Sequence, residues 1–134
     1  MDGELPNDSS IPPSTVVYRR ISPEWYGPPG EETKRVTSAA FQDKQGSLSV
    51  ALEVVLLELE LTPDVVLANH PGYGLVSLSV GLLRQLNLGV IKEPTEAEPW
   101  HGCVYGKKTG SVRSRLSKEA KLIRAPIPAP NERS

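Results

Sequence analysis

The chain has 134 residues, enough for one domain with a hydrophobic core and too few for two ordinary domains. Its formal net charge of −1 gives the whole molecule no general attraction for polyanions. The single cysteine excludes an internal disulfide and is typical of a reducing compartment. No apolar run approaches the ~18 residues that a membrane-spanning helix needs, and the acidic start differs from a signal peptide. We therefore expect a cytoplasmic protein without membrane association.

The two ends of the chain differ in composition from the middle. Residues 1–14 are acidic and polar, with too little apolar surface to offset the entropy of ordering them. Residues 125–134 contain three prolines at alternate positions, which is typical of an extended segment. We therefore expect disordered tails at both ends and a single folded domain over residues 15–124.

The first half of this domain predicts strands and short helical turns. Residues 15–21 are β-branched or aromatic and predict a strand, and residues 24–26 fit one helical turn. The segment 36–41 fits either a strand or a turn of helix. Alternating apolar residues predict a strand over 48–52, whereas 54–61 fits both a period of two and a helical period. We favour a strand followed by a helix there.

The second half begins with a clear helix signal. Thr62 is a suitable N-cap, Pro63 suits the first helical position and Asp64 supplies an acid in the first turn. This helix is short, because residues 69–72 contain a proline and a glycine that end it. A half-buried strand follows over 74–80.

Next, residues 82–87 predict a second short helix, which Gly89 would close in a left-handed conformation. Residues 90–92 and 101–105 predict strands, with an acidic loop over 93–99 between them.

The strongest helical pattern lies near the C-terminus. Apolar residues recur there at three- and four-residue spacing, namely Val112, Leu116, Ala120 and Ile123. Basic residues between 113 and 124 occupy the other positions, which predicts a basic amphipathic helix ending near Arg124. Its basic face is either a solvated surface or a contact for nucleic-acid phosphates. The whole pattern predicts an α+β fold with one modest mixed or antiparallel sheet, three to four short helices and this basic C-terminal helix.

A candidate anion site lies in the turn before this helix. Lys107 and Lys108 are cationic donors, and Thr109 and Ser111 lie where the helix should begin. The N-terminus of a helix carries free N–H groups and a partial positive charge, so it attracts phosphate or carboxylate. The spacing does not fit a Walker phosphate-binding loop, because His101 occupies a position where that loop needs glycine. The alternative is a capped helix with solvated lysines.

His101 and Cys103 form a second candidate pair, because alternate residues of a strand share one face. A metal site would need one or two further ligands, and His70 is the only other histidine. A nucleophilic Cys103 would need a base that a neighbour on the same strand is poorly placed to supply. We therefore expect an inert, half-buried cysteine, and neither a metal nor a cofactor.

The chain resembles, in outline, the ADP-ribosyltransferase-like folds. The shared features are an arginine on one strand, a Ser/Thr segment on the next and a polar residue on a late strand. The resemblance rests on Arg20, Ser38 and His101. It implies that the arginine holds a nucleotide phosphate. In such enzymes a late glutamate orients the ribose, whereas here the late strand carries His101, with Glu96 and Glu98 in the preceding loop. Histidine, with a pKa of about 6.5, is suited to act as an acid or base near neutral pH.

The order of motifs also resembles a group of small bacterial proteins for which no activity is established. The motifs are Tyr18–Ile21, Pro23–Trp25, Arg35–Phe41, a Leu-Ser-Val tripeptide and Pro99–Thr109. The likeness covers residues 16–123. It transfers no function, but it implies that Arg20, Ser38, Phe41 and His101 belong to one structural unit.

These observations lead to one main hypothesis and one alternative. The main hypothesis is a small non-catalytic binding or accessory protein that docks a phosphate-containing ligand or a protein partner. Its site would be the 106–111 turn, with Arg20, Ser38 and His101 nearby. The alternative is an enzyme acting on a nucleotide or nucleic acid, which requires these last three residues to converge in one cleft.

Overall fold

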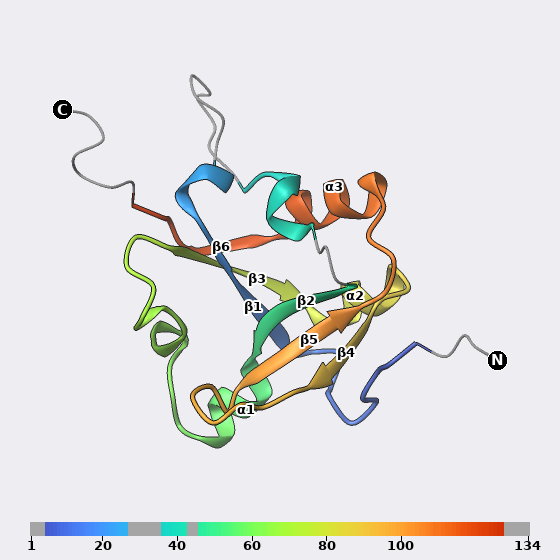
Figure 1. Cartoon of the computed structure of the whole chain (residues 1–134). Coiled ribbons are helices and arrows are strands. Elements are labelled where there is room, and N and C mark those ends of the chain that lie inside the picture. Colours follow the sequence, from blue (N-terminus) through green and yellow to red (C-terminus); the bar gives the residue numbers. More distant parts are fainter. Residues whose placement is uncertain (1–4, 27–35, 43–45, 128–134) are drawn as a thin grey trace.

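The computed structural model describes residues 5–26, 36–42 and 46–127, and it contains one six-stranded antiparallel sheet (Figure 1). The strand order is β4–β5–β2–β1–β3–β6. The strands are β1 (Val16–Ile21), β2 (Ser47–Leu52), β3 (Gly74–Ser79), β4 (Gly89–Lys92), β5 (His101–Tyr105) and β6 (Lys121–Arg124). The helices are α1 (Glu53–Glu58), α2 (Val80–Gln85) and α3 (Gly110–Glu119), with 3₁₀ turns η1 (Pro23–Trp25), η2 (Ser38–Phe41) and η3 (Pro63–Leu67). The predicted α+β class is confirmed, and the sheet is antiparallel throughout.

One face of the sheet carries the main hydrophobic core. Alternate strand residues such as Val17, Val76 and Val104 point to this face and are fully buried. Helices α2 and α3 and the turn η2 cover it, and they contribute Leu83, Leu116 and Phe41. Figure 1 shows α3 and η2 lying together over this face. The period-two pattern of the strands directs these alternate side chains to the same face.

The opposite face is apolar in one half and polar in the other. A second cluster there joins Tyr18 and Leu75 to Leu56 of α1 and Val66 of η3. The other half, over β2 and β5, carries mainly polar side chains, because the register places these residues on the same side. They are Ser47, Ser49, His101, Cys103 and Tyr105.

Strands β1 and β2 diverge, and this divergence creates the pocket described below. They pair only at Val17–Leu52 and Tyr18–Ala51. Beyond these pairs, the Arg19 guanidinium donates from Nη1 to the Ser49 carbonyl oxygen at 2.9 Å and from Nε to the Ala40 carbonyl oxygen at 3.0 Å. The side chain thus satisfies acceptors that the ladder leaves unpaired.

The helix predicted to reach Arg124 is shorter than expected. It ends at Glu119, because Ala120 takes an extended conformation with ψ of 134°. Residues 121–124 then pair with β3 as the edge strand β6. Apolar spacing predicted a helix there, but the unpaired edge of β3 offers these backbone groups partners that the isolated pattern does not reveal.

The cap of α2 also differs from the prediction. Asn87, with φ of 65°, takes the left-handed position, and the Leu88 N–H donates to the Leu83 carbonyl oxygen at 2.9 Å. Gly89 instead begins β4, where a side chain would collide with the Pro6 carbonyl oxygen. Gly89 is thus required for close packing of the N-terminal segment.

That N-terminal segment is ordered, although residues 1–14 were expected to form a disordered tail. The Asn7 Oδ1 accepts from the Val90 N–H, and the Asp8 N–H donates to the Val90 carbonyl oxygen. Ile11 is 1% exposed within the main core. One backbone–backbone hydrogen bond, one hydrogen bond to a side chain and one buried isoleucine anchor a segment whose composition is mostly polar. Residues 1–4 lie outside the described residues.

The C-terminal segment and the two segments with ambiguous patterns, 36–41 and 54–61, can also be compared with their predictions. Residues 125–127 lie against the domain, with the Ile127 N–H donating to the Gly72 carbonyl oxygen, while 128–134 lie outside the described residues. The segment 36–41 contains the helical turn η2. As favoured, a strand is followed by a helix in the 48–61 region. Thr62 does precede η3, but its side chain makes no capping hydrogen bond.

Candidate functional site

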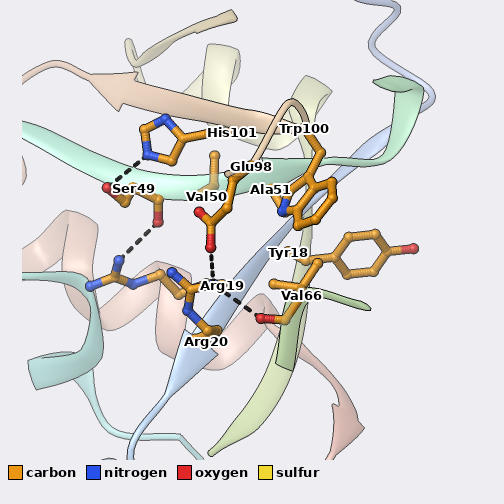
Figure 2. A pocket seen from close by; sticks show the side chains of 10 residues that line it. All are labelled: Tyr18, Arg19, Arg20, Ser49, Val50, Ala51, Val66, Glu98, Trp100 and His101. Carbon is orange, nitrogen blue, oxygen red and sulfur yellow. Dashed lines mark hydrogen bonds and ion pairs between the residues drawn. The ribbon is translucent and has the colours of Figure 1, made fainter. Parts of the chain in front are cut away.

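A small pocket opens where β1 and β2 separate (Figure 2). Its volume is about 30 Å³, which is room for roughly one water molecule. Polar and charged side chains dominate the lining, namely Arg19, Arg20, Ser49, Glu98, Trp100 and His101. Arg20 and Glu98 form an ion pair within this lining, and Arg19 contributes a second guanidinium group.

The Arg20 guanidinium is held by an acid and a carbonyl group. Its Nη1 lies 3.2 Å from Glu98 Oε2 and 3.0 Å from the Val66 carbonyl oxygen. The two charged side chains are 24% and 27% exposed, so the ion pair is shielded but not sealed from water. A guanidinium carries five N–H donors, so donors other than those on Nη1 stay available to an incoming acceptor.

The Trp100 indole contributes a buried donor without an acceptor. Its Nε1 is inaccessible to solvent and has no hydrogen-bond partner, the only such side-chain atom among the described residues. The Trp100 residue itself is 8% exposed. A buried donor left unpaired costs about 1–3 kcal/mol, so this position favours any acceptor that reaches it.

His101 is fixed through both ring nitrogens. Its Nδ1 lies 2.8 Å from the Glu93 carbonyl oxygen, and its Nε2 lies 3.1 Å from Ser49 Oγ. Because a carbonyl oxygen only accepts, Nδ1 must carry the proton in the neutral ring. The lone pair of the neutral ring is then on Nε2, available to the Ser49 hydroxyl proton or to a metal ion.

Next to His101 on the same face, Glu93 joins Cys103 and Tyr105. The Cys103 Sγ donates to Glu93 Oε1 at 3.0 Å, and the Tyr105 hydroxyl donates to Oε2 at 2.6 Å. These bonds, the one from Cys103 foremost, hold the pKa of Glu93 below its usual value. Burial, and then the Glu93 carboxylate, raise the pKa of Cys103 to about 11. The thiol is therefore protonated at neutral pH, which agrees with the expected lack of reactivity.

The turn predicted as the anion site uses its polar groups locally. The Lys108 Nζ donates to the Gly106 carbonyl oxygen at 2.8 Å. Lys108 is only 7% exposed. Thr109 Oγ1 caps α3 by accepting from the Val112 N–H. Lys107 and Ser111 are exposed.

The 106–111 turn is also remote from the pocket along the strand. It follows the C-terminal end of β5, whereas His101 begins that strand. At about 3.3 Å per residue, five residues place the two ends ~16 Å apart. None of the turn residues lines the pocket.

Of the three residues expected to converge, two do so. Arg20 and His101 line the same pocket. Ser38 begins η2, which packs against α3 on the other face of the sheet, and it is not part of the lining. The α3 contact explains this separation, because Ala40 and Phe41 of the same turn are buried in the main core.

Sequence reasoning missed several residues of the site. Glu98 and Trp100 fall in or beside the acidic loop, and nothing local marks them as facing Arg20. Glu93 was counted only as a loop acid. Ser49 lies in the strand predicted over 48–52, and nothing local marks it as a site residue. One signal was available: a period-two alternation that places serines on the same strand face pointed to a polar half of the sheet.

Comparisons with known proteins yield no relative. No protein-family model matches the chain, and no match was found among curated proteins or among solved structures. Within the described residues, no helix has the length and apolar character needed to cross a membrane.

Proposed function

We propose that this protein is a small, cytoplasmic, non-catalytic binding or accessory protein that holds an anionic group in the Arg20 pocket. The group would be a carboxylate or phosphate of a ligand or protein partner. One observation carries the proposal: Arg20 and Trp100 line the same pocket, and the buried indole Nε1 of Trp100 has no hydrogen-bond partner among the described residues. Both are donors, and an anionic oxygen would satisfy both.

Glu98 gives this proposal a mechanism. Its carboxylate already pairs with Arg20, so it occupies the position that an incoming anion would take. The backbone around Glu98 is fixed, since its N–H donates to Thr95 Oγ1 and its carbonyl oxygen accepts from the N–H groups of Thr95 and His101. Exchange therefore requires only rotation of the Glu98 side chain away from Arg20, followed by entry of the anion.

The location differs from the turn that the sequence indicated. At that turn, Thr109 caps the helix and Lys108 folds back onto Gly106. Arg20 and His101, which were expected beside the turn, support the pocket instead. The class of ligand is unchanged.

The enzymatic alternative has less support. It needs Arg20, Ser38 and His101 around one substrate, and only two of them line the pocket. We therefore favour binding over catalysis on a nucleotide or nucleic acid.

The two tryptophans provide a test with an internal control. Sodium phosphate and sodium acetate are titrated separately into the ¹⁵N-labelled protein, with sodium chloride at matched ionic strength as the control. We expect the indole N–H signal of Trp100 to shift in a saturable way. The indole of Trp25, which lies near Arg19 but is not part of the pocket lining, should shift much less.

Two variants complete this test. Arg20→Gln should abolish the saturable shift, whereas Lys107→Ala at the exposed turn should leave it unchanged. Equal movement of both indole signals, or the same titration curve in Arg20→Gln, would contradict the proposal. A loss of phosphate or acetate binding in Lys107→Ala would indicate that the anion binds at the 106–111 turn instead.

A further inference from the structure

A cluster of metal-ligand side chains lies beside the pocket, on the polar half of the sheet. Glu93 follows β4, and His101 and Cys103 are alternate residues of β5. One potential ligand atom from each lies within 4.8 Å of the others. Tetrahedral coordination at the usual zinc–ligand distances needs separations of about 3.3–3.8 Å, so small side-chain movements suffice.

The hydrogen bond between Cys103 and Glu93 shows what a metal would replace. A proton now lies between Sγ and Oε1, which are 3.0 Å apart. A divalent ion would take the place of that proton, which leaves for the solvent. Thiolate and carboxylate then balance both charges of the ion, and neutral His101 adds a lone pair. The resulting neutral set suits a site in which Cys103 is 4% exposed.

Two contacts already act as the outer sphere of such a site. His101 Nδ1–H donates to the Glu93 carbonyl oxygen at 2.8 Å, which leaves Nε2 with the lone pair, at the cost of its bond to Ser49. The Tyr105 hydroxyl donates to Glu93 Oε2 at 2.6 Å, so Oε1 faces the thiol. Histidine and carboxylate ligands of metals are usually held by partners of this kind.

We infer that Glu93, His101 and Cys103 form a binding site for Zn²⁺, with water in the fourth position. Sulfur and imidazole ligands favour zinc and related transition metals over Mg²⁺ and Ca²⁺. Three protein ligands with one open position are the arrangement of zinc sites that exchange a ligand. This inference is independent of the proposed function, since anion binding by Arg20 and Trp100 needs no metal.

Cobalt is the probe for the first experiment. The full chain, freed of metal with a chelator, is titrated with Co²⁺ and observed by absorption spectroscopy. We expect one equivalent to produce a thiolate-to-cobalt charge-transfer band and the visible bands of tetrahedral cobalt, and Zn²⁺ to abolish both. Binding of Zn²⁺ should release about one proton at neutral pH, from the Cys103 thiol.

Matched variants separate this site from adventitious binding. Cys103→Ser should remove the charge-transfer band, and Glu93→Gln should weaken cobalt binding at least about tenfold. Tyr105→Phe, which removes only an outer contact, should weaken it about 10- to 100-fold. The controls are His70→Ala, at the other histidine, and Glu98→Gln, at the acid paired with Arg20. Both should bind cobalt like the wild type.

A second measurement needs no variant, because the chain has one cysteine. One equivalent of Zn²⁺ should slow alkylation of Cys103 by iodoacetamide at least about tenfold, and chelator should reverse this. The inference is overturned if the folded wild type gives no charge-transfer band. It is equally overturned if zinc gives no protection, or if His70→Ala rather than Glu93→Gln loses cobalt. An unchanged phosphate titration in Glu93→Gln would keep the proposed function separate from this result.

Discussion

The two ends of strand β5 both gather cationic and hydrogen-bonding residues, yet they differ in what is left for a ligand. Beyond the C-terminal end, Lys108 bonds to Gly106 and Thr109 caps α3. At the N-terminal end, the Trp100 Nε1 has no acceptor among the described residues, and Arg20 is paired with Glu98. Donors close in sequence satisfy one another, whereas donors brought together by the sheet can remain unsatisfied.

This comparison has a simple physical basis. A turn that leads into a helix must satisfy its own backbone groups, and short polar side chains within a few residues do so. The pocket instead arises between two strands that diverge after two paired residues. Side chains do not fill such a gap completely, so polar atoms such as the Trp100 Nε1 remain without a partner within the described part of the chain.

The largest effect is expected at the glycines of the turn. Gly106 has φ of 123°, and a Cβ there would lie 2.7 Å from Leu88 Cδ2 and 3.0 Å from the Asn87 carbonyl oxygen. Gly106→Ala should therefore lower the free energy of unfolding by roughly 2–5 kcal/mol. Gly110→Ala, at the start of α3, should change it by less than about 1 kcal/mol, because the new Cβ would meet only Arg113 Nη2 at 3.9 Å. Urea denaturation measures both, and similar losses would show that Gly106 is not needed for chain geometry.

Next in size is the effect of Arg20→Gln on stability. This change removes the ion pair to Glu98 and the hydrogen bond to the Val66 carbonyl oxygen. We expect a loss of about 1–3 kcal/mol, because a charged donor is withdrawn from shielded acceptors. Glu98→Gln keeps an acceptor for Arg20 and should cost less. If the two variants unfold at the same urea concentration, the hydrogen bond from Arg20 to the Val66 carbonyl oxygen contributes nothing to the free energy of unfolding.

A smaller loss is expected from the N-cap of α3. Thr109→Ala removes the acceptor for the Val112 N–H and should cost about 1 kcal/mol, while Thr109→Ser should restore most of it. Neither variant should alter phosphate binding at Trp100. A large effect of Thr109→Ser on binding, with stability unchanged, would indicate that the turn takes part in the site.

The smallest effect is predicted for Lys107→Ala. This lysine is exposed, and substitutions at such positions usually change stability by less than about 0.5 kcal/mol. Thermal unfolding should be the same as in the wild type within that limit. A clear loss of thermal stability would show that Lys107 makes contacts that stabilise the fold, as Arg20 does in the pocket.

Sequence patterns predicted elements better than they predicted the site. Strands were recognisable from local alternation, and the 101–105 strand was predicted with its correct bounds. The end of α3 was missed because Ile123 continues the helical spacing, whereas residues 121–124 pair with β3 as β6. Arg20 and His101 line one pocket, whereas Ser38 does not, because Phe41 of the same turn η2 is buried in the main core on the other face.

The sequence alone determined the α+β class and the positions of most strands. These depend on the spacing of apolar residues, a local property of the chain. Only the tertiary structure decided that Glu98 meets Arg20 and that Glu93 meets Cys103. These contacts depend on the strand order and on the divergence of β1 from β2, and both are set by the packing of the whole sheet.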